Sequence, residues 1–123
     1  MALPNKQTQQ AGGGAGTYTL IAAGTNVNGI IIWSAQISNC CIGAAAASGT
    51  STFDDYITDG TVNYLGSFIG QNGPGTSGHN NAEMEYSKDG IVVPAGRAIQ
   101  LNASATALNV SHRCTATVCY TVL

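Results

Sequence analysis

The sequence predicts an all-β protein, an antiparallel β-sandwich or jelly roll of about 7–9 short strands. The final run, 113–123, alternates apolar and polar residues with period two, the spacing of a half-buried strand. Turn signals recur roughly every eight to twelve residues, and no segment shows convincing helical periodicity. The residues that share the predicted inner face of the final run are Cys114, Ala116, Val118, Tyr120 and Val122.

The first half of the chain supplies two further strands before the pattern becomes ambiguous. Residues 17–23 alternate as a first strand, and Asn28-Gly29 is a strong turn dipeptide. The β-branched opening of 30–38 favours a strand over a helix, with Trp33 in the core or in an interface. Four alanines in 39–49 favour a helix, but the segment is short and bounded by glycines, so we expect a strand with small side chains.

The middle of the chain contains two strands and the longest predicted loop. Residues 50–57 and 61–68 read as strands joined by a turn at 58–60. Residues 70–81 are rich in glycine and lack an apolar anchor, which places them on the surface. This loop is either a contact loop or a tolerated insertion. The contact residues expected in it are Asn72, Pro74, His79 and Asn80.

The last third returns to regular alternation. Residues 82–87 form a strand, and Lys88-Asp89-Gly90 makes a hairpin turn into Ile91. Residues 98–103 add another strand before the final one. Because the chain ends on its last strand, we expect the C-terminus to lie within a sheet.

The N-terminal residues 1–16 are expected to form a flexible arm, and residues 17–123 a single sandwich domain. The arm contains Gln7-Thr8-Gln9-Gln10 followed by a glycine-rich run, and it has no core face. It is either a disordered leader or a segment that becomes ordered on a neighbouring subunit.

Composition narrows the classes of function. Charged residues make up 8% of the chain, against about 25% in ordinary globular proteins. Such a surface is poorly protected against association, so we expect other subunits to cover much of it. A net charge of −2 argues against binding nucleic acid by bulk attraction. No apolar run long enough to span a membrane is present, and residues 1–6 lack the apolar core of a signal peptide.

The sequence offers few residues in catalytic or metal-binding patterns, and we expect neither an enzyme nor a bound metal or cofactor. Adjacent Cys40 and Cys41 point to opposite faces of a strand, and the two histidines lack the spacing of a zinc site. The cysteines are expected to be reduced and buried. Glu83 and Glu85 share one strand face and could serve glycoside cleavage, but a solvated strand predicts the same alternation.

The entire chain resembles a small virion protein of a tailed bacteriophage. It is similar in style to head decoration (cement) proteins and to fibre-tip domains, both commonly β-sandwich trimers. The complete frame with its own Met1 favours a stand-alone decoration protein. The segments that carry the resemblance are the glycine-rich leader, residues 18–24, residues 28–33, residues 91–97 with the Pro94-Ala95-Gly96 turn, and residues 120–123.

The resemblance implies a structural protein made in the host cytoplasm and located on the outer surface of the virion head. Its expected partners are two further copies of itself and the major capsid protein, with no nucleic acid and no membrane. The alternative is a receptor- or carbohydrate-binding tail-fibre domain, with the 70–81 loop and Tyr64 or Tyr86 as contacts. The expected capsid or subunit contacts are Leu3, Gln7, Gln10, Tyr18, Trp33, Arg97, Arg113 and Tyr120.

Overall fold

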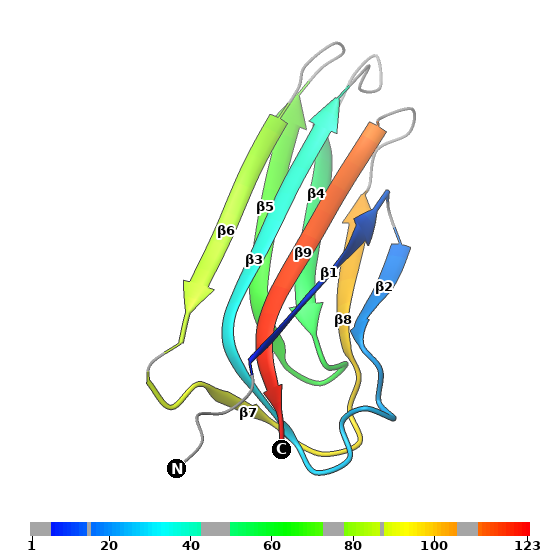
Figure 1. Cartoon of the computed structure of the whole chain (residues 1–123). Coiled ribbons are helices and arrows are strands. Elements are labelled where there is room, and N and C mark those ends of the chain that lie inside the picture. The colour runs from blue at the N-terminus through cyan, green and yellow to red at the C-terminus, as the bar shows by residue number, and fades with distance from the viewer. Residues whose placement is uncertain (1–5, 15, 43–49, 73–77, 87, 106–110) are drawn as a thin grey trace.

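The computed structural model describes residues 6–14, 16–42, 50–72, 78–86, 88–105 and 111–123, and these form nine strands in two antiparallel sheets (Figure 1). The two sheets lie face to face, so the arrangement is all-β and sandwich-like, as the sequence predicts. No helix within the described ranges is long and apolar enough to cross a membrane.

Sheet A contains the longest strands of the fold. Its order is β1-β9-β3-β6, and β7 also pairs with β3. Sheet B has the order β2-β8-β4-β5. The bounds in sheet A are β1 Gln7–Gly13, β3 Ile30–Ile42, β6 Gly78–Glu85, β7 Ile91–Val93 and β9 Ser111–Val122. Those in sheet B are β2 Gly16–Ile21, β4 Thr50–Thr58, β5 Asn63–Asn72 and β8 Ile99–Ala105.

The core lies between the two sheets and consists mainly of branched aliphatic side chains. Ile32 and Ile37 of β3 and Val118 of β9 meet Ile57 of β4 and Leu101 of β8, and all five are fully buried. Each contributes about 1.5–3 kcal/mol by leaving water. The predicted inner face of the final strand is confirmed, with its last member half-buried instead of buried. The members of that face are Cys114, Ala116, Val118, Tyr120 and Val122.

A β-bulge interrupts the pairing of β3 with β9 at Trp33. Ile32 pairs with Tyr120, but Ser34 pairs with Cys119, so Trp33 is an extra residue in the ladder. The bulge turns the indole so that its Nε1 donates a hydrogen bond to Oγ1 of Thr121, at 2.8 Å. Trp33 is therefore half-buried on the outer side of sheet A and is not part of the core.

Asn26 anchors the loop between β7 and β8. Its fully buried side chain donates hydrogen bonds from Nδ2 to the carbonyl oxygens of Pro94 and Arg97, at 2.8 and 2.9 Å. The amide of Gly96 donates in return to the Asn26 carbonyl at 2.7 Å. Gly96 has φ of 82°, a left-handed conformation that glycine adopts without steric cost. The predicted Pro94-Ala95-Gly96 turn is thus present and is held by a buried amide.

Part of the predicted flexible arm is a strand. Residues 7–13 form β1, whose pairing with β9 runs from Gln7 opposite Tyr120 to Gly13 opposite Cys114. Its side chains are mostly exposed, so backbone hydrogen bonds hold it more than burial does. The prediction of a flexible arm is corrected for these residues, while residues 1–5 lie outside the described part of the chain.

The predicted 70–81 loop is shorter than expected. Residues 70–72 continue β5 and residues 78–81 begin β6, so only 73–77 lie between them, outside the described residues. In the 39–49 segment, β3 continues to Ile42, and 43–49 lie outside the described residues. The pairing of β3 with β6 and of β4 with β5 continues through these residues, and this extends β3, β5 and β6.

Candidate functional site

The outer face of sheet A is a broad surface of mostly uncharged polar side chains. The pairing aligns them in rows across four strands, such as Gln10, Thr117, Gln36 and Glu83. A second row contains Thr8, Cys119, Ser34 and Glu85. We call this surface the sheet A face, and its residues are Thr8, Gln10, Ser34, Gln36, Ser38, Glu83, Glu85, Thr115, Thr117 and Cys119.

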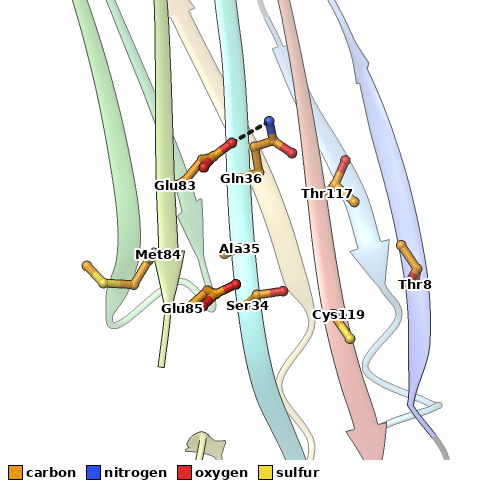
Figure 2. A pocket seen from close by; sticks show the side chains of 9 residues that line it. All are labelled: Thr8, Ser34, Ala35, Gln36, Glu83, Met84, Glu85, Thr117 and Cys119. Atoms are coloured by element: carbon orange, nitrogen blue, oxygen red, sulfur yellow. Dashed lines mark hydrogen bonds between the residues drawn. The ribbon is translucent and has the colours of Figure 1, made fainter. Parts of the chain in front are cut away.

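A shallow depression of about 290 Å³ lies at the centre of the sheet A face (Figure 2). Figure 2 shows its lining side chains coming from β1, β9, β3 and β6, all strands of one sheet. Within it, Nε2 of Gln36 donates a hydrogen bond to Oε1 of Glu83 at 3.1 Å. Ligand pockets usually measure about 300–1,000 Å³ and enclose most of the ligand. Because one sheet forms the whole lining, this depression is better suited to reversible contact with another surface than to enclosing a small molecule.

Trp33 lies beside the sheet A face, in a depression that it shares with Ser34 and Cys119. Nζ of Lys6 lies 4.6 Å from the centroid of the indole, within the distance of a cation–π contact. The same depression joins this pair to Glu85 and Lys88. Charges of both signs therefore gather in this part of a face that is otherwise almost neutral.

A separate polar cluster surrounds Asp59 in the turn between β4 and β5. Its carboxylate is fully buried and accepts from the Tyr64 hydroxyl at 2.6 Å and from Nη1 of Arg97 at 2.9 Å. The backbone amides of Thr61 and Val62 also donate to it, at 2.8 and 2.7 Å. This cluster ties the turn to the loop after β7.

The cluster sets the protonation of its members. Burial raises the pKa of the Asp59 carboxyl, but the hydrogen bonds from Tyr64, Val62, Arg97 and Thr61 outweigh it. The pKa of Asp59 is therefore well below its ordinary value, and the group is ionised. Burial, together with the adjacent Asp59 carboxylate, raises the pKa of the Tyr64 hydroxyl, which stays a donor.

Several predicted contact residues make hydrogen bonds within the chain. The buried Tyr120 donates from its hydroxyl to Oε1 of Gln7 at 3.1 Å, which joins β9 to β1. The half-buried Tyr18 donates to the Gly14 carbonyl at 2.9 Å. Arg97 pairs with Asp59 within the chain. Sequence alone does not reveal these intrachain partners, and the prediction of interface contacts at these residues stays a prediction.

Other predicted residues lie on or near the sheet A face. Gln10 lines it, Trp33 bounds it, and Arg113 is an exposed residue of β9. Leu3 lies outside the described residues.

The expected contact loop is only partly described. Asn80 is a half-buried strand residue whose Nδ2 donates to Oγ of Ser67 and to the Phe68 carbonyl, both at 3.1 Å. It is therefore not an exposed loop residue. Asn72 and His79 belong to β5 and β6, and their side chains are not described. Pro74 lies outside the described residues.

The two tyrosines of the receptor-binding alternative are engaged within the chain. Tyr64 donates to Asp59, and the Tyr86 hydroxyl donates to the Tyr64 carbonyl at 3.0 Å. Burial also raises the pKa of the Tyr86 hydroxyl. Both residues are half-buried, and both hydroxyls are engaged within the chain.

The described residues contain no group of three or more His, Cys, Asp or Glu side chains placed to hold a metal ion. Glu83 and Glu85 are exposed on the sheet A face, and Figure 2 shows both at its β6 side. No protein-family model matches the chain, and no curated protein matches it in sequence. What the sheet A face offers chemically is an array of hydroxyl, amide and carboxylate groups.

Proposed function

We propose that this protein is a structural virion protein that decorates the outer surface of a tailed-phage head as a homotrimer. The sheet A face is the surface that carries the proposal. Its outward positions are mostly uncharged and polar on four strands, and the two carboxylates lie on one edge strand, β6. The surface of a soluble monomer usually carries many charged side chains, which oppose association. This face is suited to be covered by a second copy.

The finer topology fits the same proposal. Chain segments cross repeatedly between the sheets, and the orders β1-β9-β3-β6 and β2-β8-β4-β5 place non-consecutive strands side by side. We assign this arrangement to the jelly-roll class, which includes viral capsid and lectin domains. Decoration would stabilise the head by mass action, because a ligand that binds only the assembled shell favours that state.

The homotrimer is tested by placing a charge at the centre of the sheet A face. We expect wild-type protein to have the mass of a trimer by light scattering. Thr117→Arg should reduce this to a monomer, because an unpaired buried charge is costly. The matched control is Thr19→Arg, which puts the same change on an exposed residue of β2 in sheet B. A monomeric wild type, or a trimer that survives Thr117→Arg, would contradict the assembly.

Head decoration is tested by co-sedimentation with expanded heads of the encoding virus that lack this protein. Saturable binding, together with greater resistance of the heads to heat, supports the proposal. Absence of binding by trimeric protein refutes it.

The second candidate, a receptor- or carbohydrate-binding domain of a tail fibre, draws on a different surface. The outer face of sheet B carries the exposed Phe68 and the half-buried Tyr56. A trimer that binds host cells and does not bind heads would select this candidate.

A further inference from the structure

Tyr56 lies on the outer face of sheet B, beside a glycine of the neighbouring strand β5. It faces Asn102 of β8 on one side and Gly66 of β5 on the other. A Cβ atom added at Gly66 would lie 2.9 Å from Cε1 and 3.0 Å from Cδ1 of the tyrosine ring. The ring therefore leans across β5 and occupies the space above the glycine backbone. Because the residue is only half-buried, part of its aromatic surface remains open to solvent.

Phe68 extends this aromatic surface along β5. It points to the same side as Gly66, two residues before it, and pairs with Asp54 of β4. The phenyl side chain is 55% exposed, which is unusual for so large an apolar group. Tyr56 and Phe68 thus form an aromatic platform on neighbouring strands. Packing of the core does not account for Phe68, because it points away from the core.

Neutral hydrogen-bonding groups surround the platform. Asn102 is exposed beside Tyr56, and Gln100 and Ser104 are its outward neighbours on β8. Asp54 is the one charged side chain at an outward position among the described residues of sheet B. The surface thus combines flat aromatic area with amide, hydroxyl and carboxylate groups.

We infer that the aromatic platform binds a neutral oligosaccharide. A pyranose ring has one C–H-rich face, which stacks on aromatic rings, and a rim of hydroxyls, which needs amide and carboxylate partners. Tyr56 and Phe68 supply the stacking surface, and Asn102 and Asp54 supply partners for the hydroxyls. This inference deepens the second candidate function, on whose surface it rests, by naming the ligand class, and it does not depend on head decoration or on the sheet A face.

Charge distinguishes a neutral glycan from other ligands that stack on aromatic rings. A nucleic acid strand would need cations for its phosphates. The described outward positions of sheet B offer none, and Asp54 would repel a phosphate. The same argument disfavours acidic glycans. A protein partner docking on Phe68 remains a distinct outcome of the experiment below.

The test is titration of ¹⁵N-labelled full-length protein with neutral hexasaccharides of glucose, mannose and N-acetylglucosamine, followed by NMR. We expect at least one to shift the amide signals of β4, β5 and β8 near the platform. Phe68→Ala and Asn102→Ala should each weaken binding about tenfold or more, the effect of losing about 1.4 kcal/mol. Phe68→Tyr should retain it. Both altered side chains are exposed, so thermal unfolding should be nearly unchanged.

Val92→Ala is the matched control, since Val92 is an exposed apolar residue of β7 in sheet A, 61% accessible. It should bind sugar as the wild type does. Absence of shifts with every hexasaccharide at millimolar concentration would overturn the proposal. So would shifts confined to sheet A, or binding unaffected by Phe68→Ala. Concentration-dependent self-association that disappears in Phe68→Ala, without sugar binding, would identify the platform as a protein contact instead.

Discussion

The guanidinium of Arg97 and the carboxylate of Asp59 lie 2.9 Å apart, although the two residues are separated by 38 positions in the sequence. Asp59 lies in the turn between β4 and β5, and Arg97 follows the tight turn after β7. The Asp59 side chain is fully buried, while that of Arg97 is 37% exposed. The pair therefore connects the β4–β5 hairpin of sheet B to the loop that follows β7 of sheet A.

Asp59→Asn should reduce the free energy of unfolding by about 1–3 kcal/mol near neutral pH, the cost of leaving buried or charged partners unsatisfied. Because hydrogen bonding lowers the folded-state pKa of Asp59 below 3.8, its ionisation contributes stability above that pH. The contribution is lost as the pH falls from 3.8 toward the lower folded-state value. The gap between wild type and variant should therefore narrow below about pH 4.

Urea unfolding across this pH range measures the gap. The control is Asp89→Asn, the same change at an exposed turn residue, which should alter the free energy of unfolding near neutral pH by less than about 0.5 kcal/mol. A stability loss in Asp59→Asn that stays constant down to acid pH would show that the carboxylate charge is unimportant.

Asn26→Ala should be strongly destabilising for its size. The variant removes a fully buried side chain and leaves the carbonyls of Pro94 and Arg97 without their amide donor. We expect a loss of about 1–3 kcal/mol in the free energy of unfolding. Asn28→Ala is the matched control, because its exposed amide makes one long contact, 3.4 Å, to the Leu123 carbonyl. Equal effects in the two variants, measured by thermal unfolding, would contradict this role for Asn26.

Gly12→Ala tests whether β1 is a structural strand. A Cβ atom at Gly12 would overlap the carbonyl oxygen of Cys114 and lie 2.7 Å from Cα of Thr115, so the paired backbones must move apart. We expect about 1–3 kcal/mol of lost stability, as in other overpacked sites. Amide hydrogen exchange should also accelerate along β9. Gly24→Ala, with no atom within 4 Å of the new methyl, should change neither quantity.

The strand at 7–13 also shows where sequence reasoning reaches its limit. The alternation of β9 could be predicted because one face of that strand is buried and its period is visible in the residue types. The residues of β1 are glutamine, threonine, alanine and glycine, and most are exposed. Pairing of the backbone, which leaves no mark on side-chain polarity, determines their structure.

The candidate sites also combine features that the sequence predicts with features that it does not. The sequence predicts that Glu83 and Glu85 share a strand face, since that follows from period two alone. It does not predict that Gln36 and Thr117 lie beside them, because strand order is a long-range property. The Asp59–Arg97 pair and the Tyr56–Gly66 contact were missed for that reason. The bulge at Trp33 likewise breaks the period that a pattern analysis follows.

The hydrogen bond between Trp33 and Thr121 should be measurable as a coupling energy. Trp33→Phe keeps an aromatic ring beside Lys6 but removes the Nε1–H donor, and Thr121→Val removes the acceptor from a buried position. If the 2.8 Å bond stabilises the bulge, the two losses in the free energy of unfolding should fail to add by about 0.5–1.5 kcal/mol. Denaturant unfolding followed by circular dichroism gives all four values without using tryptophan fluorescence. Strict additivity would mean that the bulge is held by backbone pairing alone, since Tyr86 also donates its amide to the Trp33 carbonyl at 3.0 Å.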